Sequence, residues 1–282
     1  MKLISWNIQW CRGCDGRVDP KRIVEHARAL ADFDVLCLQE VAANFPALAG
    51  SSGEDQFAEL AALLPGYTAI PGIAVDVPDP QGGRRQFGNL ILSRLPVGSI
   101  RRIALPWPSD PAFRSMPRMV LQATIQTAAG PVRVMTTHLE YYSALQRSAQ
   151  VDALRSIHHE AARHALADRD VETDGGPFQG QVHTPSAILT GDFNFRPDDA
   201  LYTSIQADIG EGVPRWVDAW TVRYPGTPHA HTSGVHDRNQ WPEPFTCDFV
   251  FASENLRSRI SELRVDGRTQ ASDHQPILLA LD

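Results

Sequence analysis

The N-terminal part of the chain has the pattern of a β-α-β unit, and this pattern narrows the choice of fold more than any other feature. Leu3 to Ile8 is a short apolar run of the kind that forms a buried strand. Asp19 and Pro20 provide a helix N-cap and a proline at the first helical position, so we predict a helix over residues 20–31. Val35 to Glu40 is a second buried strand. Two strands joined in this way by a helix pair in parallel within one sheet.

Strands and helices continue to alternate along the rest of the chain. The apolar patterns predict further helices over 56–64, 143–165 and 198–207, and further strands over 67–75, 87–93, 119–127, 132–138, 187–192, 216–220, 246–252, 260–265 and 276–281. The longer loops are expected over 76–86, 105–117, 168–184 and 223–244. No break in composition separates these elements, and a chain of 282 residues that is 43% hydrophobic can bury a large core. We therefore predict a single α/β sandwich domain over residues 1–282.

The charge balance argues against a protein dedicated to non-specific nucleic-acid binding, without excluding a nuclease. The chain carries 26 Lys and Arg against 33 Asp and Glu, a net charge of -7. Nucleic-acid binders usually present a basic face. No apolar run approaches the roughly 20 residues of a membrane span, and the N-terminus lacks the apolar segment of a signal peptide. A soluble, cytoplasmic protein is the expectation, and its oligomeric state stays open.

The four cysteines allow a rival interpretation. Cys11 and Cys14 form a C-x-x-C pair, which can bind zinc or carry out redox chemistry. A second pair that would complete a four-thiolate zinc site is absent from the sequence. The favoured interpretation is ordinary loop and core thiols in a reducing compartment. Zinc bound to the purified protein would support the rival.

Polar residues follow or open many of the predicted apolar strands. Asp192 and Asn194 come at the end of one strand with Phe193 between them, so the alternation of side chains points both polar groups the same way. Ligands of α/β folds bind where such strand ends gather at one edge. The other polar residues at strand ends are Asn7, Glu40, Asn89, His138, Asp248, Asp273 and His274.

These residue types suit hydrolysis of a phosphate ester. Carboxylate oxygens are ligands for a hard cation such as Mg²⁺ or Mn²⁺. Asp192 could align or deprotonate a water molecule, and the Asn194 amide could donate to a phosphate oxygen. His274, if paired with a carboxylate, could transfer a proton or stabilise charge. Together these groups predict in-line attack of water on phosphorus, assisted by a metal ion.

Short motifs distributed along the chain resemble those of the endonuclease/exonuclease/phosphatase superfamily, which includes exonuclease III-like, deoxyribonuclease I-like and sphingomyelinase-like enzymes. They occur in the family's order and are Ser5-Trp6-Asn7, Leu38-Gln39-Glu40, Gly88-Asn89-Leu90-Ile91-Leu92-Ser93-Arg94, Thr137-His138-Leu139, Gly191-Asp192-Phe193-Asn194, Asp248-Phe249-Val250-Phe251 and Ser272-Asp273-His274. Each motif alone is weakly specific, and the ordered set is strong. The resemblance implies a four-layer sandwich, with two mixed sheets face to face and helices on the outside.

The resemblance also implies roles for the metal and water-activating residues. Glu40 resembles the main metal ligand, with Asn7 beside it contacting metal or phosphate. Asp273 resembles a metal-site or supporting carboxylate. Asp192 resembles the residue that activates water, and Asn194 resembles the residue that holds the phosphate.

The two histidines of the set resemble a second group of family residues. His274 resembles the catalytic histidine, with Asp248 orienting it. His138 matches the histidine that one branch of the family uses near the leaving group. Gln9 is a departure, because some nucleases of the family have Asp there, and this puts the details of metal coordination in question. The presence of His138, where repair nucleases often have Tyr nearby, favours the deoxyribonuclease I, phosphatase and sphingomyelinase side.

Three further residues are candidates for substrate contacts, each with a simpler alternative. Asn89 either holds the phosphate or only stabilises its strand. Arg118 either reaches the phosphate or is a solvated surface residue. Trp220 either contacts the substrate or packs at the rim. The histidines at 229, 231 and 236 lie in one loop and could form a substrate lip or, with less support, a metal cluster.

The sequence thus predicts a divalent-metal-dependent phosphodiesterase or nuclease that cleaves phosphate ester bonds. Nucleic acid, a lipid headgroup and a small molecule all stay open as substrates, and so do an abasic-site or exonuclease III-type DNA nuclease and a phosphatase. A non-catalytic binding module on the same fold is disfavoured, because such relatives should have lost catalytic positions, and Glu40, Asp192, Asn194, Asp248 and His274 are all present. One or two bound metal ions are compatible with the sequence.

Overall fold

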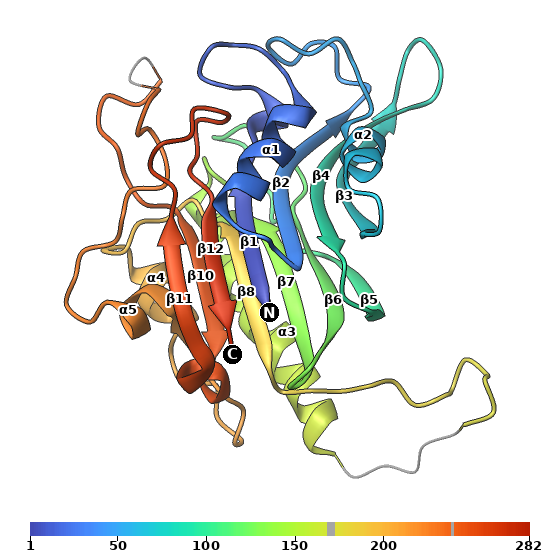
Figure 1. Ribbon diagram of the computed structural model, residues 1–282, viewed down its shortest axis with the longest axis vertical. Coiled ribbons are helices and arrows are strands. Elements are labelled where there is room, and N and C mark those ends of the chain that lie inside the picture. The colour runs from blue at the N-terminus through green and yellow to red at the C-terminus, as the bar shows by residue number, and fades with distance from the viewer. Residues whose placement is uncertain (168–172, 238–239) are drawn as a thin grey trace.

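Two mixed six-stranded sheets packed face to face form the centre of the protein, with helices on the outer faces (Figure 1). The computed structural model describes residues 1–167, 173–237 and 240–282. The first sheet has the strand order β11 (Ile260–Val265), β12 (Ile277–Leu281), β1 (Lys2–Asn7), β2 (Val35–Ala43), β4 (Arg84–Ser93) and β3 (Thr68–Pro78). The second has the order β5 (Val97–Ala104), β6 (Met119–Thr127), β7 (Gly130–His138), β8 (Ala187–Asp192), β10 (Asp248–Ser253) and β9 (Trp216–Asp218). The predicted α/β sandwich of two mixed sheets is confirmed.

Each sheet contains one β-α-β unit at its centre, and the two units place their strand ends together. In the first sheet, β1 and β2 pair in parallel across helix α1 (Pro20–Leu30). In the second sheet, β7 and β8 pair in parallel across helix α3 (Ala144–Leu166). The other strand pairs recorded in both sheets are antiparallel. Because β1 contacts β8 and β2 contacts β7 across the sandwich, the ends of these four strands meet at one edge.

The outer helices are held by capping and by an apolar face. Asp19 accepts a hydrogen bond from the Arg22 backbone N–H, and Pro20 occupies the first helical position, as the sequence predicts. The buried face of α1 covers the outer side of the first sheet, with Ile23 and Leu30 among its apolar residues. Burying each such side chain contributes about 1.5–3 kcal/mol. Helix α2 (Gln56–Leu63) lies beside α1, and α4 (Ala200–Ile205) lies beside α3.

The structure corrects several predicted boundaries. The predicted loop 76–86 is mostly strand, because β3 extends to Pro78 and β4 begins at Arg84, and only 79–83 form the tip of the hairpin. Strand β5 has no counterpart among the predicted strands; it is an edge strand with alternating burial, and it follows the Leu95-Pro96 turn. The predicted strand over 216–220 is a short strand, β9, followed by helix α5 (Ala219–Arg223). Of the predicted loop 168–184, residues 168–172 lie outside the described residues, as do 238–239 of the loop 223–244.

His158, on helix α3, is a polar residue that is fully buried. Its ring stacks on Trp216 with 4.0 Å between ring centroids. Its Nδ1 lies 2.7 Å from Arg133 Nη2, and its Nε2 lies 2.8 Å from the carbonyl oxygen of Pro214. Helix α3 therefore buries a polar residue that joins it to both β7 and the segment before β9.

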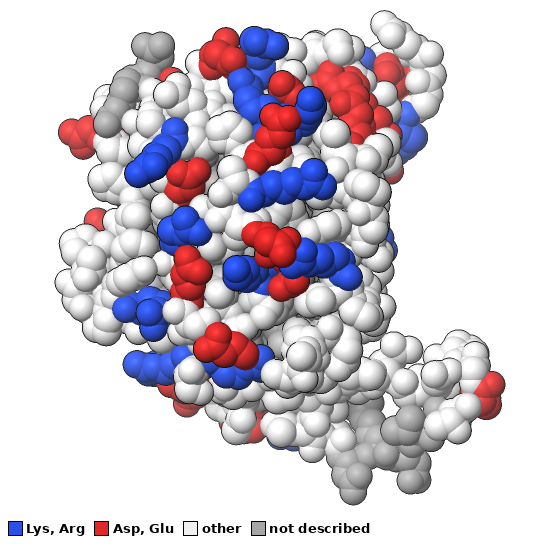
Figure 2. Space-filling model, in the orientation of Figure 1, with Lys and Arg blue, Asp and Glu red and all other residues white. Residues whose placement is uncertain are grey.

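The visible surface has mixed charge. In Figure 2, acidic and basic side chains alternate over α1 and the neighbouring strands, and this face carries no continuous basic surface. Several charges of the described residues are paired, for example Arg94 with Asp34 at 2.9 Å and Arg264 with Glu262 at 3.2 Å. None of the described helices has both the length and the apolar character that a membrane crossing needs.

Candidate active site

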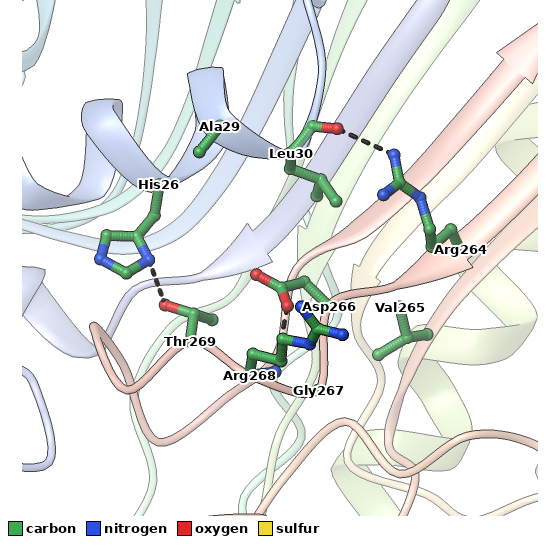
Figure 3. Close-up of a pocket in the computed structure, with 9 residues that line it drawn as sticks. All are labelled: His26, Ala29, Leu30, Arg264, Val265, Asp266, Gly267, Arg268 and Thr269. Carbon is green, nitrogen blue, oxygen red and sulfur yellow. Dashed lines mark hydrogen bonds between the residues drawn. The ribbon is translucent and has the colours of Figure 1, made fainter.

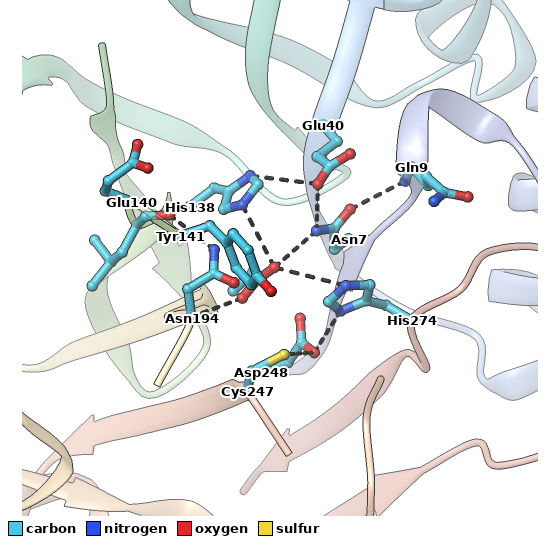
Figure 4. Close-up of polar contacts among 12 residues, drawn as sticks. Asn7, Gln9, Glu40, His138, Glu140, Tyr141, Asn194, Cys247, Asp248 and His274 are labelled. Atoms are coloured by element: carbon cyan, nitrogen blue, oxygen red, sulfur yellow. Dashed lines mark hydrogen bonds and ion pairs between the residues drawn. The ribbon is translucent and has the colours of Figure 1, made fainter. Parts of the chain in front are cut away.

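Three strand ends and a position inside β2 bring polar side chains from both sheets to one point (Figure 4). Asn7 ends β1 and Glu40 lies in β2, while His138 ends β7 and Asp192 ends β8. The Asn7 amide nitrogen donates to Glu40 Oε1 and to Asp192 Oδ2, both at 3.0 Å. A single amide therefore connects the two sheets at the predicted site.

Glu40 points into this site because β2 contains a bulge. The pairing of β2 with β4 shifts register between Leu38 and Val41, and Glu40 has a φ of 61°. A bulge places an extra residue in one strand and redirects a side chain. A non-glycine residue in the left-handed region is strained and is often found at a functional site.

The glycine before Asp192 allows β8 to approach β7 closely. Gly191 has a φ of 142°, and a Cβ atom there would lie 1.9 Å from the carbonyl oxygen of Thr137. Only glycine fits such an approach. The close pairing sets His138 opposite Asp192 in the parallel register. Asp192 is then held by the Asn194 backbone N–H, which donates to its Oδ1 at 3.0 Å.

A histidine–carboxylate pair lies beside Asp192 in the site. Strand β10 begins at Asp248, directly opposite Asp192 in the antiparallel register. His274 precedes β12, and its Nδ1 lies 2.8 Å from Asp248 Oδ2. Its Nε2 lies 3.8 Å from Asp192 Oδ2. Although burial disfavours the charged imidazole, the neighbouring Asp248 carboxylate raises the pKa of His274 well above its usual value.

His138 has the opposite electrostatic setting. Its Nε2 lies 3.6 Å from Asp192 Oδ2, and its Nδ1 lies 3.9 Å from Glu40 Oε1. Burial, together with the positive charges of Arg118 and His274, lowers the pKa of His138 well below its usual value. The site thus contains one histidine that favours the charged form and one that favours the neutral form. Two titratable groups with pKa values pushed apart are suited to different roles in proton transfer.

Three carboxylates crowd the same pocket and fit a divalent cation; Asp192 and Asp273 are buried, and Glu40 is half-buried. Burial and the nearby Asp273 raise the pKa of Glu40 to about 7. Burial and the nearby Asp248 raise the pKa of Asp192 to about 6. Burial also raises the pKa of Asp273. Carboxylates that repel one another out of water are stabilised by a hard dication such as Mg²⁺ or Mn²⁺, and Glu40, His138 and Asp192 each offer a ligand atom within 4.8 Å of the others.

Two of the predicted metal-site residues are partly engaged with protein groups. Asn7 presents its amide nitrogen to the carboxylates, and its oxygen accepts from the Gln9 backbone N–H at 3.1 Å. Asp273 Oδ2 accepts from Gln9 Nε2 at 2.9 Å. Gln9 is the residue at which this chain departs from some nucleases. Its uncharged amide orients the Asp273 carboxylate and leaves the charge of that carboxylate in place.

Most of these groups, though not Asn7 or Asp248, line one pocket of about 440 Å³. The lining also includes the aromatic residues Trp10, Phe87, Tyr141, Tyr142 and Trp241, and the Tyr141 ring contacts those of Tyr142 and Trp241. Tyr141 packs edge-on against Trp241 with ring centroids 6.0 Å apart. The sequence reasoning missed Tyr141 and Tyr142, although both follow closely on His138.

Two of the three candidate substrate residues, Arg118 and Asn89, lie at or beside the pocket, and Asn194 lines it. Arg118 lines the pocket, its Nε donates to Glu140 Oε2 at 3.3 Å, and its buried Nη1 has no hydrogen-bond partner among the described residues. It is therefore buried and not a solvated surface arginine. Asn89 lies in an adjoining small cavity with His138, and its amide nitrogen is 3.4 Å from the carbonyl oxygen of Met119. Asn194 lines the pocket and donates to the carbonyl oxygen of Leu139 at 2.9 Å, which leaves its second N–H available.

Trp220 is not brought to this pocket. It lies on α5, where its indole N–H donates to the carbonyl oxygen of Thr227 at 3.1 Å and its ring stacks against His229. His229 Nε2 lies 2.5 Å from Asp218 Oδ2, so this histidine is part of a packed network. Trp220 therefore lines a separate small cavity and not the site pocket, and a substrate contact by its indole stays a prediction.

The remaining candidate features lie elsewhere. The cavity in Figure 3, about 520 Å³, is lined by α1 and the turn after β11, and none of its lining residues lines the site pocket. There His26 pairs with Thr269 at 2.8 Å, and Arg264 donates to the carbonyl oxygen of Leu30. Cys11 and Cys14 are free thiols and belong to none of the groups of three potential metal ligands found among the described residues.

Comparison with known proteins identifies relatives of the same fold. A model of the Endonuclease/Exonuclease/phosphatase family matches residues 4–274, a span that includes the whole site. No curated protein matches the sequence.

Solved structures agree with the family match. An endonuclease/exonuclease/phosphatase from Beutenbergia cavernae is 25% identical, with a TM-score of 0.70, and the match covers 100% of this chain and 71% of that one. The 3′ phosphatase NExo from Neisseria, solved with a product DNA hairpin, is 20% identical, with a TM-score of 0.62 over 100% of this chain and 99% of that one. A humanized D. rerio TDP2 is 18% identical, with a TM-score of 0.63 over 100% and 98%.

Proposed function

The chain belongs to the endonuclease/exonuclease/phosphatase family, and from this premise we propose that it is a divalent-metal-dependent phosphodiesterase of the nuclease type. Family membership makes it a phosphoesterase hydrolase. The single observation that carries the finer proposal is the position of Asp192 in the pocket. Asn7 and Glu40 lie on one side of it, and the Asp248–His274 pair lies on the other. Such an arrangement can hold a phosphate ester with a carboxylate ready to act on water.

Asp192 is the proposed water-activating residue. Its Oδ1 is fixed by the Asn194 N–H and its Oδ2 by the Asn7 amide. With a pKa raised to about 6, it is a stronger base than an ordinary aspartate and is still largely ionised at neutral pH. It can therefore orient a water molecule and accept its proton during in-line attack on phosphorus.

His274 and Arg118 are the proposed phosphate-charge stabilisers. His274 favours its charged form because of Asp248, so its Nε2–H can donate to a phosphate oxygen. The unpartnered Nη1 of Arg118 provides a second donor at the pocket wall. Asn194 contributes the free N–H of its amide. Donors fixed in a buried site stabilise developing charge without reorganisation.

His138 is proposed to act at the leaving group, and Glu40 with Asp273 to hold the cation. Being neutral, His138 can accept or relay a proton near the departing oxygen. When bound, Mg²⁺ or Mn²⁺ would polarise the phosphoryl oxygens and stabilise the charge on the leaving oxygen. Glu40 reaches this position through the bulge in β2, with Asn7 holding the carboxylate in place.

Nucleic acid is the proposed substrate, and two observations support it. The structurally similar 3′ phosphatase from Neisseria was solved with a product DNA hairpin. The aromatic rings of Tyr141 and Trp241, in the same pocket as the carboxylates, offer planar surfaces against which an unstacked base can pack. A lipid headgroup or small phosphodiester is the alternative outcome of the test.

The test is nicking of supercoiled DNA in the presence of Mg²⁺ or Mn²⁺. Nicking by the wild type is expected to be lost with EDTA and to fall by about 100-fold or more in Asp192→Asn. Asp198→Asn is the matched control, because it removes the same charge from an exposed residue of the same segment and is expected to leave nicking unchanged. Full nicking by a folded Asp192→Asn protein would contradict the proposal. Failure to nick DNA, combined with Mg²⁺-dependent hydrolysis of a phospholipid or small phosphodiester, would keep the chemistry and change the substrate.

A further inference from the structure

Cys247 is a buried thiol beside the active site that the proposed hydrolysis does not use. It directly precedes β10 and is 2% exposed. Its Sγ lies 3.5 Å from Asp248 Oδ2, the same oxygen that contacts His274 Nδ1 (Figure 4). Its backbone is held on both sides, since its N–H donates to Thr232 Oγ1 and its carbonyl oxygen accepts from the Phe193 N–H. The thiol is therefore fixed in position next to the histidine–carboxylate pair.

The thiol belongs to a set of mixed donor atoms. Asp192, Cys247, Asp248 and His274 each offer one ligand atom, and these four atoms lie within 4.8 Å of one another. All four residues are buried. Four ligands around tetrahedral zinc, with bonds of about 2.0–2.3 Å, lie about 3.5 Å apart. Cys247 Sγ already lies 3.5 Å from Asp248 Oδ2, so the other atoms reach that spacing if the Asp248–His274 pair, now 2.8 Å apart, separates slightly and the wider pairs, within 4.8 Å, close slightly.

Donor chemistry distinguishes this set from the carboxylate side of the pocket. Glu40 and Asp192 present oxygens, with His138 nearby, and oxygen ligands suit Mg²⁺ or Mn²⁺. The Cys247 set adds a sulfur and an imidazole nitrogen, and this combination suits a softer ion such as Zn²⁺. Asp192 belongs to both groups. An ion held by the Cys247 set would therefore compete for the same carboxylate.

We propose that Asp192, Cys247, Asp248 and His274 form an inhibitory zinc site. On binding, the Cys247 thiol and the His274 imidazolium each release one proton to solvent. The resulting thiolate and neutral imidazole coordinate Zn²⁺ together with the two carboxylates, and the hydrogen bond between Asp248 and His274 is replaced by bonds to the ion. The redox state of the sulfur does not change. The inhibition rests on the proposed function, because the ion occupies the water-activating Asp192 and the charge-stabilising His274. The binding itself does not depend on that function.

Cys14 provides a matched control for the thiol. Its Sγ lies 3.4 Å from the carbonyl oxygen of Ser272 near Asp273, and it is only half-buried. In the part of the chain that the structure describes, it belongs to no group of three potential metal ligands. Cys14→Ser removes a more accessible thiol near the pocket without touching the proposed zinc set.

The binding test uses reduced protein stripped with EDTA and titrated with Co²⁺, whose thiolate complexes have a charge-transfer band in the near ultraviolet. Wild type and Cys14→Ser are expected to show this band at one equivalent and to lose it when Zn²⁺ is added. Folded Cys247→Ser and Cys247→Ala are expected to lack it. No band in the wild type, or a band that survives in a folded Cys247 variant, would overturn the proposal.

A second measurement avoids dependence on any variant. X-ray absorption of the wild type loaded with one equivalent of Zn²⁺ is expected to show one sulfur ligand at about 2.3 Å, with nitrogen and oxygen completing the shell. A shell of nitrogen and oxygen only would exclude Cys247 as a ligand. This outcome is decisive even if both Cys247 variants fail to fold.

The activity test separates the zinc site from the proposed hydrolysis. Each protein is assayed with Mg²⁺ and increasing Zn²⁺, and its rate is divided by its own rate without zinc. The inhibitory zinc concentration is expected to rise by roughly tenfold or more in Cys247→Ser and to stay unchanged in Cys14→Ser. Equal inhibition of all three active proteins would refute the inhibitory role. If no protein hydrolyses any phosphodiester, the proposed function fails, and the cobalt and zinc measurements still decide the site.

Discussion

His158 is expected to make the protein lose stability as the pH falls from 7.5 to 5. Its Nδ1 faces the Arg133 guanidinium, which can only donate, so Nδ1 must accept and Nε2–H must donate to the carbonyl oxygen of Pro214. A proton on Nδ1 would face a cation inside the fold. Burial and the Arg133 charge accordingly lower the pKa of His158 to about 3.

The size of the effect follows from linkage. The unfolded chain, with a histidine pKa of about 6.5, binds a proton over a range in which the folded protein keeps His158 neutral. The stabilising contribution is therefore complete above about pH 6.5 and is lost progressively between there and the folded pKa of about 3. For these two pKa values the loss between pH 7.5 and pH 5 is about 2 kcal/mol.

The measurement is urea unfolding at both pH values, in EDTA, for the wild type and two variants. His158→Gln cannot titrate. We expect it to be less stable than the wild type at pH 7.5, because it loses the ring packed on Trp216, but to lose about 2 kcal/mol less on acidification. His159→Gln is the control on the same helix; His159 is partly exposed and lies 3.5 Å from Glu211, so this variant should follow the wild-type pH dependence. Equal acid sensitivity in His158→Gln and the wild type would refute the reasoning, as would a histidine NMR titration showing an ordinary pKa for His158.

Three further results are expected. Arg118→Ala should reduce kcat/KM by about 10-fold to 100-fold and lower the melting temperature, because it removes a hydrogen-bond donor from the pocket and leaves Glu140 buried without its ion pair. Arg118→Lys should recover part of the lost stability. A kcat/KM of the alanine variant equal to that of the wild type would exclude Arg118 from the site. Mg²⁺ at 100 times its Kd should raise the free energy of unfolding of the wild type by about 2.7 kcal/mol, whereas Glu40→Gln should show little gain. In EDTA at pH 8 the Glu40→Gln protein should be more stable than the wild type. The reason is that the pKa of Glu40, raised to about 7, means that the ionised carboxylate destabilises the metal-free fold above that pH. Gly191→Ala should lower the free energy of unfolding, measured in urea, by about 3 kcal/mol or more, because the added Cβ would overlap backbone atoms. Gly267→Ala, where a Cβ meets no atom within 4 Å, should change it by no more than about 0.5 kcal/mol. Similar changes in the two variants would contradict the steric argument.

The local patterns of the sequence were sufficient to predict the elements that carry the site. The cap at Asp19 and Pro20 and the apolar runs on either side of α1 predicted a β-α-β unit, which the structure confirms. The position of Asp192 at the end of a buried strand, with Asn194 two residues later, was readable in the same way. These predictions succeeded because capping, helical periodicity and strand alternation depend on neighbours in the sequence.

The failures occurred where a residue's surroundings come from distant segments. The sequence left Trp220 either in contact with substrate or packed at the rim, and the structure places it outside the pocket because the strand there ends at Asp218 and helix α5 follows. The burial of His158 was not predicted, because it depends on Arg133 and Trp216, which are distant in the sequence. A helical repeat shows which residues share a face, but it does not show what packs on that face.

The sequence by itself determined the order of most strands and helices, β5 and α5 excepted, and the chemical types of residue at their ends, and the ordered motifs were enough to predict the family. Only the tertiary structure decided which of those ends meet. The bulge that turns Glu40 inward, the approach of β8 to β7 at Gly191 and the placement of Cys247 beside His274 all arise from pairing between strands far apart in the chain. The pKa values of Glu40 and Asp192 likewise depend on burial and on charges brought close by packing. Through-space electrostatics and steric fit need the distances between residues, and these distances exist only after the two sheets have packed together.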